Sequence, residues 1–255
     1  MSAKDNQKVY FGDKKVSKEN KKDGVESIFT KVSDNYDLMN DVMSLGMHRL
    51  WKRSFIHASK IKKEDICLDL AAGTGDIAKL ISKKVKGKTI YLCDQNNEMI
   101  EKAKERSLNE GFYQKCNFSV SSAEGLPYEN ETFDKVFISF GFRNFSDKNG
   151  SLNEIYRVLK KGGKLQILEF SSAQGKNFSK LYDFYSYNFI PKIGNLISGD
   201  HDSYDYLVKS IRTHENQEEM LELFHQTGYL ECEFENIFKG IVAIHRGTKL
   251  SLIHI

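Results

Sequence analysis

A glycine-rich loop between a predicted strand and a predicted helix is the clearest candidate for binding chemistry in this sequence of 255 residues. Residues 68–76 read Leu-Asp-Leu-Ala-Ala-Gly-Thr-Gly-Asp, so an apolar run leads into Gly73 and Gly75. Glycines at such a turn let a ligand approach the backbone closely. Asp94 ends the next apolar run, where a carboxylate can accept hydrogen bonds from both hydroxyls of a ribose. Together, the loop and the carboxylate predict a site for an adenosine-type ligand.

The loop alone leaves two cofactors open, because residues 73–78 also satisfy the GxGxxG/A pattern of nicotinamide-dependent oxidoreductases. Asp69 favours S-adenosylmethionine, since a carboxylate there would meet the amino group of a methionine and would repel a pyrophosphate. Residues 121–124, Ser-Ser-Ala-Glu, form a small polar turn after the third predicted strand that is positioned to read adenine. Asp76 as an ordinary helix N-cap and Ser122 as an ordinary turn residue remain the alternatives.

The elements that would position these residues alternate between short β-rich runs and helical stretches. The predicted strands are 66–71, 89–93, 117–121, 135–139 and 164–170, and the helices between them are 76–84, 97–109 and 148–159. This alternation is typical of a doubly wound α/β fold with a parallel sheet covered on both faces. Residues 157–165 form the helix-turn-strand unit that methyltransferases place before their fifth strand. A helix over 216–227 and a hairpin of strands 229–236 and 241–245 are predicted to finish the sheet antiparallel.

Three further segments frame this unit. Residues 1–23 are mostly polar and are expected to form a flexible arm, so that a single domain spans 24–255. Within 24–60 the apolar spacing predicts two helices. Residues 171–215 carry eight aromatic side chains and few strand signals, and we expect them to form an insertion over the carboxyl ends of the strands that covers the ligand. Packing of these aromatic rings in a helical core is the alternative.

Composition limits the remaining classes of function. The 38 Lys and Arg residues exceed the 35 Asp and Glu residues by only three. This excess is too small for a nucleic-acid footprint, and it argues against a methyltransferase that acts on RNA. Four cysteines without CxxC spacing fit a reduced, cytoplasmic compartment and predict no metal site. No apolar run reaches the roughly 18 residues that would span a bilayer, so any membrane contact must be peripheral. The oligomeric state is left open.

Several blocks of residues outside the glycine loop resemble the ubiquinone/menaquinone biosynthesis C-methyltransferases. The blocks are 29–52, 139–144 (Ser-Phe-Gly-Phe-Arg-Asn), 168–171, 204–211 and 240–245, and the resemblance covers roughly residues 25–249. The first and last blocks are far more specific than a glycine pattern, because general methyltransferases lack them. Two departures are Ala72, where the family usually has glycine, and Phe142, which replaces an aliphatic residue.

The resemblance implies a class I S-adenosylmethionine-dependent methyltransferase that methylates a ring carbon of a prenylated quinol. The family's cofactor contacts correspond to Thr74, Asp94, Ser122 with Ala123, and Ser139. The implied reaction is demethylmenaquinol to menaquinol, and the benzoquinol step of ubiquinone biosynthesis is the alternative. An oxidoreductase, and a module that binds S-adenosylmethionine or a quinone without catalysis, are the rival classes.

Methylation of a ring carbon needs a quinol that has lost a hydroxyl proton, and the developing phenolate must be stabilised. Arg143 and Asn144, directly after the fourth predicted strand, are the candidates for this task, with a structural ion pair as the alternative for Arg143. Arginine is a poor base, so Glu169 and His48 are candidates to take the proton. Tyr36 is predicted to lie over the cofactor, with core packing as its alternative.

A stripe of apolar residues is a candidate for contact with the membrane that holds a prenylated quinol. Its members are Met47, Leu50, Trp51, Phe55 and Ala58, and His48, Arg49, Lys52, Arg53, His57 and Lys60 lie on the remaining faces of the same predicted helix. This pattern is typical of an interfacial helix. The alternative is that the stripe packs on the sheet.

Overall fold

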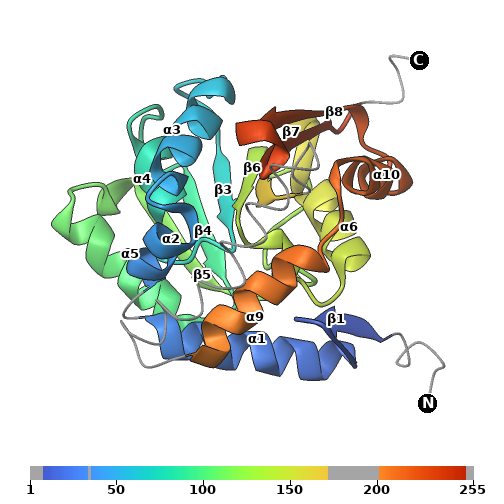
Figure 1. Ribbon diagram of the computed structural model, residues 1–255. Coiled ribbons are helices and arrows are strands. Elements are labelled where there is room, and N and C mark those ends of the chain that lie inside the picture. The colour runs from blue at the N-terminus through green and yellow to red at the C-terminus, as the bar shows by residue number, and fades with distance from the viewer. Residues whose placement is uncertain (1–7, 34–35, 172–200, 251–255) are drawn as a thin grey trace.

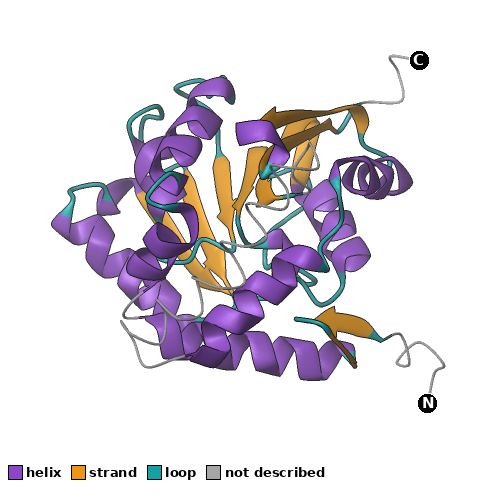
Figure 2. Cartoon of the chain, viewed as in Figure 1, coloured by secondary structure: helices purple, strands orange, loops and turns teal. Residues whose placement is uncertain are grey.

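A seven-stranded sheet forms the centre of the computed structural model, which describes residues 8–33, 36–171 and 201–250 (Figure 2). The strands are β3 (Cys67–Leu70), β4 (Ile90–Asp94), β5 (Cys116–Val120), β6 (Phe133–Ser139), β7 (Leu159–Phe170), β8 (Leu230–Ile237) and β9 (Val242–Thr248). Their order is β5-β4-β3-β6-β7-β9-β8, with β9 antiparallel to both of its neighbours and the other pairs parallel. The predicted doubly wound sheet and its antiparallel finish are confirmed. Ligands bind such sheets at the switch point, here beside β3 and β6.

Helices cover both faces of this sheet, and two more cross its lower edge in Figure 1. They are α1 (Lys18–Val32), α2 (Tyr36–Ser44), α3 (His48–Ala58), α4 (Asp76–Ser82), α5 (Asn97–Asn109), α6 (Lys148–Val158), α9 (His201–Arg212) and α10 (Gln217–Thr227). Helices α3, α4 and α5 lie on one side of the sheet and α6 and α10 on the other, while α1 and α9 lie below it (Figure 1).

The period-two alternation of the strands divides the apolar residues between two cores. On β6, Phe137 packs edge-on against Phe55 of α3, with ring centroids 5.7 Å apart. Its neighbours Val136 and Ile138 point to the opposite core, where Phe224 of α10 is fully buried. Successive side chains of a strand point to opposite faces, so an apolar run is needed where both faces are covered.

The expected flexible arm is wrong for residues 8–23. A hairpin of β1 (Val9–Phe11) and β2 (Lys14–Val16) leads directly into α1, which Ser17 caps by accepting a hydrogen bond from the Asn20 backbone. The Phe11 ring lies against Gly24 in the middle of α1 and 4.6 Å from the Tyr206 ring of α9. The hairpin is therefore held by residues far away in the sequence.

The apolar stripe predicted over 47–58 is divided between the core and the surface. Trp51 and Phe55 are buried, whereas Leu50 and Ala58 are exposed and Met47 is half-buried. Contact of this helix with a membrane stays a prediction. Trp51 of α3 packs 6.4 Å from the rings of Phe140 and Phe170, and Phe55 has no exposed surface. His48 and Lys52 are buried too, and Lys52 pairs with Asp76. The segment 24–60 contributes to three helices rather than two. No helix within the described ranges is long and apolar enough to cross a bilayer.

The predicted insertion at 171–215 lies largely outside the described residues, which omit 172–200. Its aromatic residues Phe178, Tyr182, Phe184, Tyr185, Tyr187 and Phe189 belong to that part. The described end of the segment is α9, where Tyr204 and Tyr206 are buried. For these two rings, core packing is the arrangement observed.

We expect Gly24→Ala to destabilise or stabilise the protein depending on whether Phe11 is present. A Cβ at Gly24 would come within 2.7 Å of the Phe11 ring, so Gly24→Ala alone should destabilise the protein. With Phe11→Ala already in place, the same change should stabilise α1 by about 1 kcal/mol, because alanine favours helix more than glycine does. Urea unfolding of the four variants measures both effects. Equal effects of Gly24→Ala in the two backgrounds would contradict the packing described.

Candidate active site

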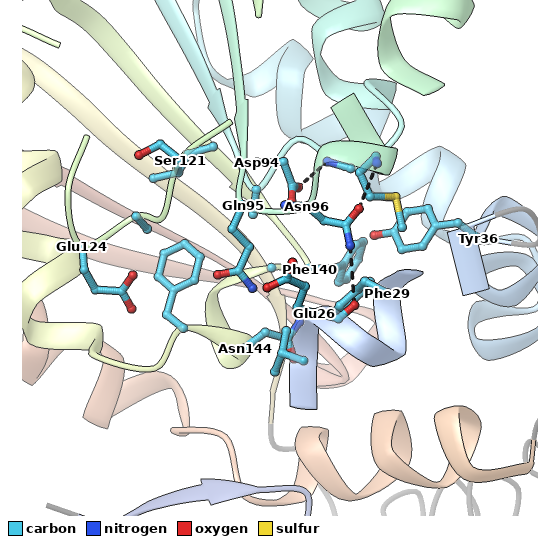
Figure 3. A pocket seen from close by; sticks show the side chains of 18 residues that line it. Glu26, Phe29, Tyr36, Asp94, Gln95, Asn96, Ser121, Glu124, Phe140 and Asn144 are labelled. Atoms are coloured by element: carbon cyan, nitrogen blue, oxygen red, sulfur yellow. Dashed lines mark hydrogen bonds between the residues drawn. The ribbon is translucent and has the colours of Figure 1, made fainter. Parts of the chain in front are cut away.

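A cleft opens where β3, β4, β5 and β6 end, and it encloses about 650 Å³ including space open to solvent. Side chains from the sheet edge and from α1 and α2 point into it (Figure 3). The lining residues are Val25, Glu26, Phe29, Tyr36, Leu70, Ala71, Gly73, Asp94, Gln95, Asn96, Met99, Ser121, Ala123, Glu124, Phe140, Gly141, Asn144 and Phe145.

Asp94 is held in place by backbone donors. One carboxylate oxygen accepts from the Gly73 N–H at 2.9 Å and the other from the Asn96 N–H at 2.9 Å, so β4 and the glycine loop are joined through this side chain (Figure 3). Burial raises the pKa of Asp94, and these two hydrogen bonds oppose the shift. Each carboxylate oxygen has two lone pairs, so both retain capacity to accept a further hydrogen bond from a ligand.

Tyr36, the first residue of α2, closes the cleft over the glycine loop. A Cβ at Gly73 would stand 3.4 Å from the Tyr36 ring, and Gly73 has a φ of +53°, which favours glycine. Burial raises the pKa of the Tyr36 hydroxyl to about 12, so the hydroxyl keeps its proton and can donate it in a hydrogen bond. Tyr36 therefore lies beside the glycine loop, and its position over a bound cofactor stays a prediction.

Ionic contacts fix α2 to that loop. Arg106 of α5 bonds Asp76 at 2.6 Å and also pairs with Asp37, the residue after Tyr36. The Thr74 hydroxyl donates to Asp37 at 3.1 Å and accepts from Arg106 at 3.0 Å. Burial of Asp76 works against its ionisation, yet Lys52 and Arg106 lower its pKa to about 2. The alternative reading of Asp76 as an ordinary N-cap is not observed, because Gly75 is the N-cap of α4.

Two loops approach each other at the floor of the cleft. A Cβ at Gly141, after β6, would fall 2.7 Å from the Ala71 Cβ, after β3, so only glycine fits there. Asn144 follows in the short 3₁₀ helix η3 (Phe142–Asn144), and its Oδ1 accepts from the Tyr206 hydroxyl at 2.9 Å. Its amide NH2 group remains to donate to a ligand in the cleft.

Arg143 does not line this cleft. Its guanidinium is buried and bonds Glu169 of β7 at 2.8 Å, the Phe140 carbonyl oxygen at 2.6 Å and the Ser210 hydroxyl at 3.2 Å. Glu169 has no exposed surface and also accepts from the backbone N–H groups of Arg143 and Phe170. The structural ion pair stated as the alternative is therefore the arrangement observed.

The remaining predicted site residues lie in different places. Asp69, Thr74 and Ser139 line a smaller neighbouring hollow, and Tyr36 and Ala71 line both this hollow and the cleft. The Asp69 carboxylate accepts from the Ala78 N–H at 2.9 Å, and burial raises its pKa well above the ordinary value. Gly75 and Ser122 line neither space, whereas Ala123 lines the cleft.

The two predicted bases also lie away from the cleft. Glu169 is the partner of Arg143, and His48 is buried against Asp41, with its Nε2 2.9 Å from a carboxylate oxygen. Burial lowers the pKa of His48.

Sequence reasoning missed the wall that α1 contributes. Val25, Glu26 and Phe29 line the cleft, and the Asn96 amide donates to the Thr30 hydroxyl at 2.8 Å, which ties α1 to the end of β4. The helical spacing of Val25 and Phe29 was a usable signal for an apolar face. It did not indicate that this face covers a ligand site.

The sheet order and the place of the cleft are those of the class I S-adenosylmethionine-dependent methyltransferases. The structure resembles solved members of that class. A methyltransferase from Aquifex aeolicus matches with a TM-score of 0.60 and 16% identity over 83% of this chain and 98% of that one. Phosphoethanolamine N-methyltransferase 2 of Haemonchus contortus, solved with S-adenosyl-L-methionine, matches with a TM-score of 0.59 and 17% identity over 79% of this chain and 52% of that one.

The sequence identifies the family within this class. The model of the ubiE/COQ5 methyltransferase family matches residues 14–249, and the chain belongs to that family. The protein named ubiquinone/menaquinone biosynthesis C-methyltransferase UbiE of Hydrogenovibrio crunogenus is 46% identical over 94% of this chain and 95% of its own length. The protein of the same name from Xanthomonas oryzae is 44% identical over 95% and 96%. The resemblance of the sequence blocks is confirmed.

We expect Arg143→Met to lower the free energy of unfolding by about 3–5 kcal/mol, because it leaves the Glu169 carboxylate buried and unpaired. The double variant Arg143→Met/Glu169→Leu should recover much of that loss, since no charge remains to be desolvated. Urea unfolding of the two single variants and the double variant measures the coupling. If Arg143→Met removed activity at unchanged stability, the guanidinium would be acting on the substrate instead.

Proposed function

We propose that this protein transfers the methyl group of S-adenosylmethionine to a ring carbon of a prenylated quinol, with demethylmenaquinol as the acceptor. Membership of the ubiE/COQ5 methyltransferase family carries this proposal, and the names of the relatives cover both menaquinone and ubiquinone biosynthesis. Methylation of a benzoquinol is therefore the second candidate for the same site.

The described residues fit S-adenosylmethionine. The free capacity of the buried Asp94 carboxylate suits two ribose hydroxyls, and the small residues Ser121 and Ala123 leave room for an adenine ring. The bound cofactor supplies an electrophilic methyl group on a sulfonium centre. A nicotinamide cofactor would bring a pyrophosphate to the glycine loop, where the Gly73 N–H already donates to the Asp94 carboxylate.

The acceptor side of the proposal rests on Asn144, Phe140 and Glu26. The Asn144 NH2 group donates to the quinol oxygen as it becomes a phenolate, and the bond from Tyr206 fixes the orientation of that amide. Phe140 and Phe29 offer apolar walls for the ring. Glu26, on α1, provides a carboxylate in the cleft to which the hydroxyl proton can pass. Holding the two reactants in line contributes about 7–11 kcal/mol to such a reaction.

Asp94→Asn should weaken S-adenosylmethionine binding at least about tenfold, because the amide loses charge-assisted hydrogen bonds and turns an NH2 group toward backbone donors. Calorimetry on the purified protein measures the affinity. Glu101→Gln, an exposed carboxylate on α5, is the matched control and should leave the affinity unchanged. Equal affinities for all three proteins would contradict the cofactor assignment.

Asn144→Leu should lower kcat about 100-fold while the affinity for S-adenosylmethionine stays near that of the wild type. The reason is that one donor to a developing oxyanion contributes mainly in the transition state. Single-turnover transfer of labelled methyl from S-adenosylmethionine to a reduced naphthoquinol and to a reduced benzoquinol measures the effect and ranks the two substrates. Cofactor binding without transfer to either quinol would overturn the proposed acceptor but not the cofactor.

A further inference from the structure

A second cleft is lined by Arg143 of η3 and encloses about 850 Å³ including space open to solvent. Its walls come from the β1–β2 hairpin, α1, α9 and the start of α6, and Phe145 lines both clefts. In Figure 1 the hairpin and the ends of α1 and α9 meet in this region. The proposed methyl transfer uses none of the groups that face only this second cleft.

Among the charged side chains that line it, cations outnumber carboxylates. Lys8, Lys18, Lys21, Arg143 and Lys148 stand against Asp147 and Glu215. Three of the five cations have carboxylate partners: Lys18 pairs with Asp147 at 2.8 Å, Lys148 pairs with Glu215, and Arg143 pairs with Glu169. Lys8 and Lys21 remain as the excess of positive charge. The hydroxyls of Tyr206, Ser210 and Thr213 belong to the same lining.

Lys21 is the feature that points to a ligand. It is only 4% exposed, and its ammonium group has three N–H bonds. Among the described residues it donates one hydrogen bond, to the Arg143 carbonyl oxygen at 3.1 Å. A buried ammonium without a carboxylate partner is costly, and lysine is almost never buried unless it is paired.

The surroundings of Lys21 suit an anion. The pKa of Lys21 is lowered to about 7, chiefly by burial and also by the neighbouring cations Lys148 and Arg143, while Glu215 and Glu124 act in the opposite direction. His214 lies against Glu215, and burial lowers its pKa. An anion at Lys21 would restore the charged form and balance the excess of positive charge.

We propose that this second cleft binds a tetrahedral oxyanion, as a phosphate or phosphomonoester group, through the ammonium of Lys21 with Lys8 at the rim. Such a group suits the Lys21 ammonium, since its oxygens accept several hydrogen bonds at once. The group can belong to a soluble metabolite or to a phospholipid headgroup. This proposal is independent of the quinol and needs no methyl transfer for its test.

Sulfate is the appropriate first probe, because its charge is constant near neutral pH. Calorimetry should detect saturable binding that Lys21→Met weakens at least about tenfold. Lys22→Met is the matched control, because Lys22 is the next residue of α1, is exposed and does not line the cleft. Lys8→Met tests the rim without touching a buried residue and should weaken binding a few-fold. Affinity should fall as the pH rises above about 7, where Lys21 loses its proton in the free protein.

A second arm identifies the source of the anion. Flotation with vesicles of phosphatidylcholine alone and of phosphatidylcholine with phosphatidic acid tests a headgroup, and inorganic phosphate in calorimetry tests a soluble group. Loss of either interaction in Lys21→Met but not in Lys22→Met supports the site and names its source. Absence of saturable binding to sulfate, phosphate and both vesicles, or equal affinities for the Lys21 and Lys22 variants, would overturn the proposal.

Discussion

The buried ion pair between Arg143 and Glu169 is the constraint on which the rest of the site depends. Two charges buried from solvent need hydrogen-bond partners besides each other, and here the backbone N–H groups of Arg143 and Phe170, the Phe140 carbonyl and the Ser210 hydroxyl supply them. The pair thereby joins the end of β7, the loop after β6 and α9. Phe140 has a φ of +59°, which is unfavourable for a bulky residue, and the bond to its carbonyl helps to hold it there. The floor of the cofactor cleft is fixed as a result.

The cover of the cleft is attached by a different kind of interaction. Helix α2 is tied to the glycine loop through Asp37, Thr74 and Arg106, in contacts that are only partly buried. Partly exposed ion pairs contribute less than buried ones and are weakened by salt. The floor is thus held by strong, desolvated bonds and the cover by weaker, solvated bonds. This difference suits a site that must admit a cofactor beneath Tyr36.

Much of the fold could be predicted from the sequence because its determinants are local. The apolar runs and the caps placed α5 at the bounds that the structure has, and the spacing from the glycine loop to Asp94 placed the carboxylate at the cleft. The hairpin at 9–16 was missed because it depends on Phe11 meeting Gly24 and Tyr206, and no local pattern encodes those contacts. The stripe on α3 has the same period whether it faces lipid or a sheet, so periodicity could not distinguish the two. The sequence indicated both Arg143 and Glu169 as candidate site residues, but only the structure shows that they form an ion pair with each other.

Two adjacent residues of η3 line different clefts. Asn144 lines the cofactor cleft, while Arg143 lines the second cleft and offers its carbonyl oxygen to Lys21 there. The Glu169 carboxylate pairs with the guanidinium and offsets part of its positive charge. A sulfonium cofactor is itself cationic, and an unpaired arginine beside it would oppose its binding. The ion pair that holds the floor in place therefore also offsets positive charge near a cationic cofactor, and in the proposed reaction the neutral amide of Asn144 is the group that stabilises the phenolate.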